Sequence, residues 1–504
     1  FKQKTAYEIR LSLVGSEMCI RDRNMSNGQK AAILVTLTVT VGTFVTTITI
    51  ANVSLPQLQG AFAATQDQIT WIITATLVAQ AIATPLSGWL DNRFGRRRIL
   101  LICATSFTIT SILCGLASTL EELVIWRFFQ GLSGAPLVPL SQAILVTIYP
   151  KEQHGRVLVF WMFGPIIGSI LAPLIGGFIS EDYSWRWVFM LSVPPAILCV
   201  ASLFIFMKTP QTQQQGKKLD WLGFISLSIC VTALQLVLDR GQLLDWFDSP
   251  IIIFGALLAT VTFYLFVSHV CTSDNPFLNP RLLRDRNYAV GILLGFTFGM
   301  LYFTTFVLQP TMLQSLRGYP DSLIGLIQAT RGLGLLAGAI FLLLFLKNLD
   351  PRFNIFLGFL IEVITGIGMS QFDINMTIST VTWFTILQGF GLGMIWSPLM
   401  VLALATLDIR YVSEGASVFH LMRNIGSSVH IAATATFVVR SSKENYSVLV
   451  ESLNPFNEVY AFQGTVGDWS ISGSTNLAIV SEEIGRQATM IGYVNACLLY
   501  TSDA

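Results

Sequence analysis

The chain has 504 residues, of which 53% are hydrophobic and only 12% are charged, and its formal net charge at pH 7 is +1. This composition excludes an ordinary water-soluble domain, in which about a quarter of the residues are charged. The balanced charge gives no basis for binding to nucleic acid. Many apolar stretches reach the roughly 20 residues that a membrane-spanning helix needs. We therefore predict an all-α integral membrane protein that has the lipid bilayer as its solvent.

Apolar stretches of spanning length follow one another along most of the chain. The first six lie at 31–54, 69–86, 99–117, 123–148, 157–179 and 187–207. After a polar linker at 208–218 come seven more, at 221–238, 250–271, 289–309, 323–346, 353–370, 377–405 and 415–439. Residues 487–496 have the pattern of the start of a fourteenth span, which we expect to be truncated.

The two ends of the chain differ in character from the rest. Residues 1–24 lack the long apolar core and small-residue cleavage site of a signal peptide, and with 497–504 they resemble translated sequencing-adaptor read-through. We expect the native protein to begin at Met25. The predicted domains are an N-terminal six-helix bundle at 25–207, a linker with two inserted helices at 208–286, and a C-terminal bundle at 287–496 whose last helix is incomplete.

Charged residues are distributed unevenly between the loops on the two sides. One side carries the arginines of 93–98, the lysines of 208–218 and the arginines of 281–286, whereas the other is mainly acidic, as at Glu121 and Glu122. Lys and Arg accumulate in loops that are not translocated. The basic side and the N-terminus are therefore predicted to be cytoplasmic, with the polar stretch between the last two spans on the opposite side.

A weak internal repeat relates the two halves. Residues 126–140 read WRFFQGLSGAPLVPL and residues 384–399 read FTILQGFGLGMIWSPL, so each contains Gln-Gly, a further glycine and Pro-Leu. Each segment lies in the fourth helix of a six-helix set when the two inserted helices are set aside. The repeat indicates two six-helix bundles related by an axis along the membrane normal.

The loop after the second span, GWLDNRFGRRR, combines glycines with charge at fixed positions. Gly88 and Gly95 permit close helix approach and a tight turn, and Asp91 can accept hydrogen bonds from Arg93 or Arg96. A loop fastened in this way can act as a conformational latch. The alternative is that its arginines only satisfy the topology rule and bind lipid headgroups.

This loop resembles the one between helices 2 and 3 of major facilitator superfamily transporters. Further motifs are NVSLP at 52–56, RFFQG at 127–131, APLIGG at 172–177, WRWVF at 185–189 and GASVFHLMRNIGSS at 415–428. Their order is similar to that of the 14-helix drug:proton antiporter branch, the EmrB/QacA type. The resemblance runs from about residue 33 to residue 496.

The resemblance implies a proton-coupled secondary transporter of the bacterial cytoplasmic (inner) membrane. Such proteins export hydrophobic or amphiphilic toxic compounds by alternating access, and the latch stabilises one face of that cycle. In Gram-negative cells they can work with a periplasmic membrane-fusion adaptor and an outer-membrane channel. Two alternatives stay open: a carrier for a single metabolite or siderophore on the same fold, and a non-transporting membrane receptor or scaffold.

APLIGG in the fifth span indicates a gating hinge. Pro173 removes a backbone hydrogen bond and permits bending, and Gly176 and Gly177, one turn later, permit close packing against a helix of the other half. Ordinary small-residue packing is the alternative, because glycine is common in membrane helices.

Cationic and amide side chains lie within the predicted spans. Arg127 and Gln130 are three residues apart in the fourth span, and Arg331 and Arg423 are far from the ends of theirs. Because a guanidinium in hydrocarbon is costly unless it is paired or faces water, we expect these four residues to line a cavity or relay. For Arg127, snorkelling to the headgroups is the alternative.

The first span departs from the pattern of the family. Relatives have an aspartate five residues before the asparagine of the NVSLP-like segment, where this chain has Thr47. The candidate proton carriers are therefore Glu362, near the middle of its span, and His420, since histidine titrates near neutral pH. Each has a purely structural alternative. With arginines and amides but no acid in the first span, a neutral or anionic amphiphile is favoured over a cation.

Catalytic and cofactor chemistry is not indicated. GLGLLAG at 332–338 lies inside an apolar helix and lacks the lysine of a phosphate-binding loop. The four histidines and seven cysteines have no metal-ligand spacing. We predict no enzyme activity, no metal and no cofactor, with a proton gradient as the source of energy.

Overall fold

The computed structural model describes residues 26–182, 184–207, 219–273, 276–345, 349–408, 411–451, 453 and 474–502. The N-terminal half contains α2 (Asn27–Val53), α3 (Leu55–Phe62), α4 (Gln66–Phe94), α5 (Arg96–Leu116), α6 (Leu120–Gly134), α7 (Leu137–Ile148), α8 (His154–Asp182), α9 (Trp185–Met190) and α10 (Val193–Phe206). Then follow α11 (Trp221–Arg240), α12 (Pro250–Thr272), α13 (Arg286–Arg317), α14 (Asp321–Phe345), α15 (Pro351–Met369), α16 (Ile378–Ala405), α17 (Val412–Glu451) and α18 (Ser474–Ser502).

Twelve helical segments of the described residues are long and apolar enough to cross a membrane. They correspond to the first twelve predicted spans. The thirteenth lies in α17, which is long enough but richer in small and polar residues. The helix α18 covers the predicted start of a fourteenth span, begins earlier at Ser474 and continues to Ser502. The described part of the chain is therefore an all-helical, multi-pass membrane protein.

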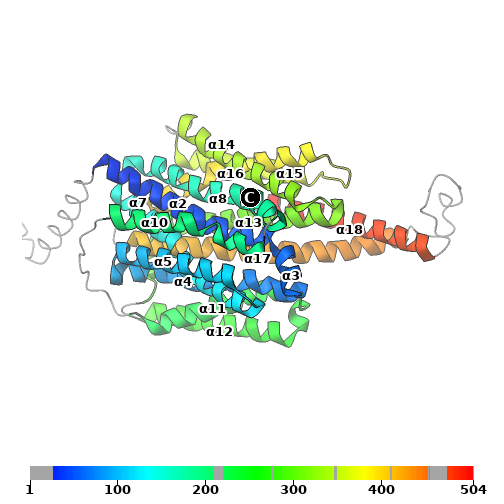
Figure 1. Ribbon diagram of the computed structural model, residues 1–504, viewed down its shortest axis with the longest axis horizontal. Helices are drawn as coiled ribbons and strands as arrows, with labels where there is room; N and C mark the ends of the chain where they lie inside the picture. Colours follow the sequence, from blue (N-terminus) through cyan, green and yellow to red (C-terminus); the bar gives the residue numbers. More distant parts are fainter. Residues whose placement is uncertain are drawn as a thin grey trace, which may run out of the picture.

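The long helices run side by side and pack in the same way in the two halves (Figure 1). In the first half α2 packs on α8, and α6 on α4 and α5; in the second half α13 packs on α17, and α16 on α14 and α15. The two halves meet along two pairs of helices, α4 with α17 and α8 with α14. Each of these contacts in one half thus has its counterpart in the other, as an internal repeat requires.

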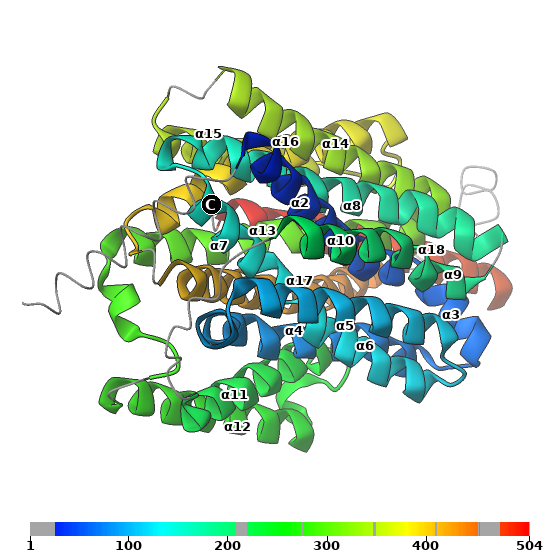
Figure 2. The ribbon, with the colours of Figure 1, turned by 60° about the vertical axis from the view of Figure 1, so that its left-hand side comes forward.

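The inserted helices α11 and α12 form a pair at one edge of the molecule (Figures 1 and 2). They pack on each other, and α11 also contacts α4 from the first half and α17 from the second. More than half of the large apolar side chains of α12 lie on the surface, as at Phe254 and Tyr264. Such a surface suits contact with lipid.

The fourth predicted span is interrupted in the structure. The helix α6 ends at Gly134, and Pro136, with φ of −65°, precedes α7. Proline has no N–H to donate to the preceding turn, so the hydrogen-bond ladder is broken here. The break separates Gln130, at the end of α6, from Gln142 on α7.

Buried apolar residues show where the two halves are joined. At the end that carries the α4–α5 turn, one cluster combines residues of both halves, among them Leu145, Trp161, Trp396 and Phe419. At the other end each half has a cluster of its own: one includes Ile69, Cys114 and Phe189, and the second includes Met312, Ile327 and Met490. The structure is therefore closed at the α4–α5 end.

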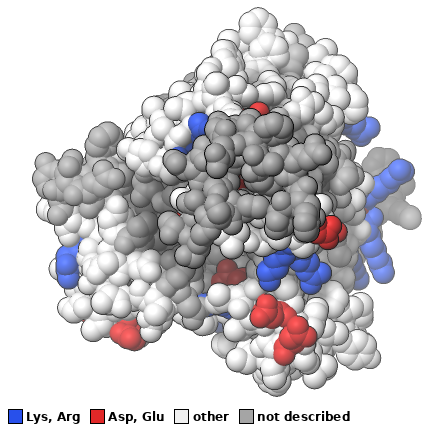
Figure 3. Space-filling model, turned by 90° about the vertical axis from the view of Figure 1, so that its right-hand side faces the viewer, with Lys and Arg blue, Asp and Glu red and all other residues white. Residues whose placement is uncertain are grey.

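The helices α17 and α18 pack on each other and extend beyond the other helices at the opposite end of the molecule (Figure 1). Figure 3 views the molecule from that end, where acidic and basic patches lie among mostly uncharged side chains. Residues 441–451 and 474–485, which the sequence placed in a polar stretch between spans, are helical.

Candidate functional site

The α4–α5 turn is held by an ion pair and by side-chain hydrogen bonds. Gly95 ends α4 with φ of +83°, a conformation that side-chain-bearing residues rarely adopt. This turn brings Arg96 back to Asp91, whose carboxylate oxygens accept from Nε at 3.0 and 3.2 Å. Arg96 also donates from Nη1 to Thr147 of α7, at 2.6 Å. Asp91 is buried and Arg93 is exposed.

Gly88 lies one turn before Asp91, where α4 meets α17. A Cβ atom at this position would lie 2.9 Å from Cα of Glu414, so any larger residue would separate the helices. Beside it the hydroxyls of Ser87 and Ser417 are 2.7 Å apart. The structure therefore places Gly88 at the contact between the two halves, with Asp91 and Arg96 fixing the turn behind it.

His420 forms a second link between the halves. Its Nε2 donates to Oε1 of Gln142 on α7, at 2.6 Å, and both side chains are buried. The rings of Trp396 and Phe419 lie against the imidazole, with centroids at 5.8 and 5.9 Å. Nδ1 has no hydrogen-bond partner. A titratable side chain thus lies in the contact that closes one end of the molecule.

Arg127 and Gln130 lie together inside the N-terminal half. Nη1 of Arg127 donates to Oε1 of Gln130 at 2.7 Å, and the Gln130 amide donates to Ser111 of α5 at 2.8 Å. The guanidinium lies over the ring of Phe189. Arg127 is only 1% exposed, so its side chain does not reach the surface as snorkelling would require.

Arg331 and Arg423 approach neighbouring residues of α13. Arg331 donates from Nη2 to the carbonyl oxygen of Tyr302 at 2.6 Å and lies over the Tyr302 ring. Arg423 lies over the rings of Phe303 and Trp396 and donates to Oδ1 of Asn424 at 2.9 Å. The structure thus brings two cationic groups, from α14 and α17, to one level of α13.

Glu362 is buried inside the C-terminal half, between α15 and α16. It is 3% exposed, and its Oε1 has no hydrogen-bond partner and faces Gly391. It lies close to Gln388 and Arg331. The Gln388 amide donates to Thr305 of α13 at 2.8 Å, and its Oε1 is also without a partner. A buried carboxyl group with an open acceptor beside an amide can hold a proton.

The predicted hinge residues Pro173, Gly176 and Gly177 lie within α8. The side chain of Pro173 and the surroundings of Gly177 are outside the described part of the structure. A Cβ atom at Gly176 would lie 2.6 Å from Cγ1 of Ile50, on α2 of the same half. Contact with the other half is made earlier in α8, where Ile170 packs against Gly332 of α14.

Thr47, at the position where relatives have an acid in the first span, bonds to its own helix. It is buried, and its hydroxyl donates to the carbonyl oxygen of Thr43 at 2.8 Å, a bond within its own helix. Within the described residues, no three His, Cys, Asp or Glu side chains lie close enough together to hold a metal ion.

Sequence reasoning missed the partners of several site residues. Nothing in the sequence connects Gln142 with His420, or Glu414 with Gly88, because each pair is separated by hundreds of residues. The loop before α15 is described only from residue 349, where Asp350 caps α15 by accepting from the N–H of Arg352 at 2.9 Å.

Comparison with known proteins shows the family of this chain. The sequence profile of the Major Facilitator Superfamily matches residues 37–430. The multidrug export protein EmrB of Haemophilus influenzae is 31% identical over 466 residues, which cover 92% of this chain and 91% of that protein. The fatty acid resistance protein FarB of Neisseria gonorrhoeae is 30% identical over 448 residues, 88% of each chain.

Among solved structures, the proton:xylose symporter XylE of E. coli covers 95% of both chains with a TM-score of 0.59 and 14% sequence identity. At this identity the likeness concerns the fold alone. With its paired bundles, the glycine-aspartate turn after α4 and the EmrB proteins among its relatives, the chain belongs to the Major Facilitator Superfamily, in the EmrB/QacA-type branch.

Proposed function

We propose that the chain is a proton-coupled transporter that exports hydrophobic or amphiphilic toxic compounds by alternating access. The observation that carries this proposal is the shared apolar core at the α4–α5 end, opposite two separate cores at the other end. A molecule built in this way exchanges one closed end for the other when the halves tilt. The export activity in the name of the EmrB relative supports the direction of transport.

The closed end faces the cytoplasm in this proposal. It carries Arg93, Arg97 and Arg98, and basic residues accumulate in loops that are not translocated. The N-terminus is then also cytoplasmic, and the membrane is the bacterial inner membrane. The projecting ends of α17 and α18 are periplasmic, on the side where a membrane-fusion adaptor and an outer-membrane channel would meet the transporter.

The substrates that we infer are neutral or anionic amphiphiles. Arg331 and Arg423 lie at one level of α13 among the rings of Tyr302 and Phe303, and Arg127 adds a cation in the other half. Aromatic rings beside guanidinium groups suit a molecule with an apolar body and a neutral or negative head. The fatty acid resistance named for FarB is in keeping with this class.

Glu362 is the proton carrier that we propose, with His420 as a second candidate. Glu362 has an open acceptor oxygen in the interior of the C-terminal half. His420 has an open Nδ1 at the contact between the halves. Proton uptake at either group changes the hydrogen bonding of a helix that moves in alternating access, which is what coupling requires.

The latch and the hinge are parts of the same proposal. Gly88 lets α4 approach α17, and Asp91 with Arg96 holds the turn behind that contact. Pro173, Gly176 and Gly177 lie in α8, the helix of the first half that packs on α14 of the second. We infer that α8 bends there when the closed end opens.

Efflux measured with and without a protonophore tests the proposal. The full chain is expressed in a host that lacks its own efflux pumps, and resistance to several unrelated amphiphiles is expected, with loss of efflux when the protonophore collapses the gradient. Transport of one solute without broad resistance would support a single-metabolite carrier instead. Reconstituted vesicles that show no flux under a pH gradient would support a receptor or scaffold.

A further inference from the structure

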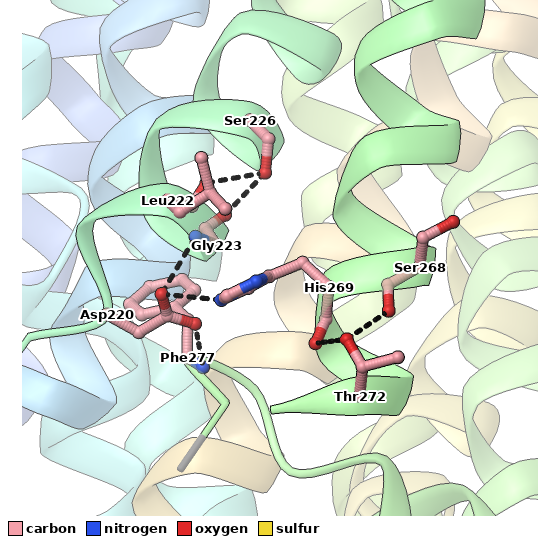
Figure 4. Close-up of polar contacts among 8 residues, drawn as sticks. All are labelled: Asp220, Leu222, Gly223, Ser226, Ser268, His269, Thr272 and Phe277. Carbon is pink, nitrogen blue, oxygen red and sulfur yellow. Dashed lines mark hydrogen bonds and ion pairs between the residues drawn. The ribbon is translucent and has the colours of Figure 1, made fainter. Parts of the chain in front are cut away.

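Asp220 joins three separate parts of the chain where α11 begins and α12 ends (Figure 4). Its Oδ1 accepts from Nε2 of His269, in the last turn of α12, at 2.8 Å, and from the N–H of Gly223, in the first turn of α11, at 3.0 Å. Its Oδ2 accepts from the N–H of Phe277, at 3.0 Å, in the segment that leads to α13. One carboxylate therefore holds both inserted helices and the segment after them.

The side chain of Phe277 extends this junction into both halves. It is 8% exposed, and its ring lies 5.3 Å from that of Phe224 of α11. The apolar cluster around it includes Ala81 of α4, Leu227 of α11 and Leu421 of α17. The cluster thus contains residues from the N-terminal half, the inserted pair and the C-terminal half.

Two residues after Phe277 the same segment reaches the contact between Gly88 of α4 and Glu414 of α17, which we call the closed contact. The N–H of Asn279 donates to Oε1 of Glu414 at 2.5 Å. Glu414 is the residue whose Cα faces Gly88, three residues before the Ser417 hydroxyl that meets Ser87. The path from Asp220 to the meeting point of α4 and α17 is therefore only one short segment without helix, 276–279.

We propose that Asp220 is a positioning residue for the transport cycle: through segment 276–279 it holds Glu414, and so α17, in the closed contact with α4. The inserted helices then do more than face lipid, because they stabilise the conformation that is closed at the α4–α5 end. This inference rests on alternating access as part of the proposed function. It assigns to Asp220 a role through Glu414 and not a contact with substrate.

Crosslinking across the closed contact measures this role directly. The full chain, with its native cysteines replaced, carries Ser87→Cys and Ser417→Cys, whose hydroxyl positions are 2.7 Å apart. Asp220→Asn keeps the size of the side chain but offers an N–H₂ group where one carboxylate oxygen was. We expect it to slow disulfide formation at this pair at least threefold.

The matched control is Asp248→Asn, the same change at an exposed position at the other end of the inserted pair. It is expected to leave the rate unchanged. A second cysteine pair at Ser441 of α17 and Asn495 of α18, two short side chains whose polar atoms are 3.2 Å apart, distinguishes positioning from general loosening. Asp220→Asn should not slow that pair. The proposal would be overturned if the 87–417 cysteine pair formed its disulfide at the same rate in Asp220→Asn and Asp248→Asn. It would also be overturned if Asp220→Asn slowed both cysteine pairs equally.

A second comparison does not depend on the folding of the Asp220 variant. Asn279 has φ of −77°, which proline can adopt, so Asn279→Pro removes the N–H that bonds Glu414, whereas Asn279→Ala retains it. The proline variant should crosslink the 87–417 pair more slowly than the alanine variant. Equal rates would again overturn the proposal. Crosslinking needs no substrate, so failure of drug export in the unaltered chain would refute the proposed function and leave this result standing.

Discussion

His420 on α17 donates a hydrogen bond to Gln142 on α7, across the contact between the two halves of the molecule. Both groups are buried, and their bond joins the two halves at the closed end. Removing either partner leaves the other buried and unpaired, at a cost of about 1–3 kcal/mol. We expect His420→Phe and Gln142→Leu each to lower the thermal midpoint, and the double variant to lose less than the sum. Strictly additive losses in calorimetry would show that the two residues do not interact.

Glu362→Gln should abolish transport that is driven by a pH gradient. Glutamine has nearly the shape of the protonated acid but cannot release a proton, so the variant should still exchange substrate across vesicles without a gradient. Glu362→Asp should retain part of the driven transport. Both assays use reconstituted protein. Full gradient-driven export by Glu362→Gln would exclude this residue as the carrier.

Gly88→Ala should weaken the closed contact, whereas Gly155→Ala should not. The new Cβ at Gly88 would lie 2.9 Å from the backbone of Glu414, but nothing lies within 4 Å of the corresponding position at Gly155. We expect export by the first variant to fall roughly tenfold, equivalent to about 1.4 kcal/mol. The initial rate of drug efflux measures this, at matched expression. Equal rates for the two variants would contradict the role given to Gly88.

Arg423→Gln should change substrate preference more than overall activity. The substitution removes a positive charge beside Phe303 and Trp396 and retains hydrogen-bond donors. Resistance to fatty acids should fall by a larger factor than resistance to cationic dyes, measured as inhibitory concentrations in the same host. An equal loss for both classes would indicate a structural role for Arg423.

Asp285 makes the start of α13 sensitive to acid. The backbone N–H of Tyr288, the hydroxyl of Thr406 and the N–H of Asn287 lower the pKa of this carboxyl group. A lowered pKa means that the ionised cap stabilises the fold above the ordinary carboxyl pKa, and that the stabilisation is lost as the pH falls through the lowered value.

Asp285→Ala should therefore reduce stability by about 1 kcal/mol near neutral pH. The difference between the thermal midpoints of the two proteins should stay constant from about pH 5 to pH 8 and shrink below about pH 4. A difference that does not depend on pH across this range would show that the ionised carboxylate is not what stabilises the cap.

The spans could be predicted from the sequence because lipid imposes a minimum apolar length on each helix. The prediction of 99–117 differs from the observed α5 by three residues at the start and one at the end. The break before Pro136 was missed, since apolarity continues through it. The end of α17 was missed for the opposite reason: residues 440–451 are too polar for lipid but still form a helix.

For the candidate site, a local contact could be predicted from the sequence, but the contacts between distant residues could not. The bond from Arg96 to Asp91 was expected, because five residues across a glycine turn are a local relationship. The partners of His420 and Gly88 depend on how two helix bundles meet, which periodicity does not encode. Asp220 had a local signal that was not used: an aspartate three residues before Gly223 at the start of an apolar helix is typical of an N-cap.

The uninterrupted length of α17 has a mechanical consequence. Its 40 residues run from the Glu414 contact to the tip that projects beyond the other helices, about 60 Å at the rise of an α-helix. If a rigid helix of that length tilts by about 10° about its Glu414 end, its other end moves by roughly 10 Å. In the proposed cycle, opening of the closed end would therefore move the α17–α18 tip, and a probe placed on that tip would report the change.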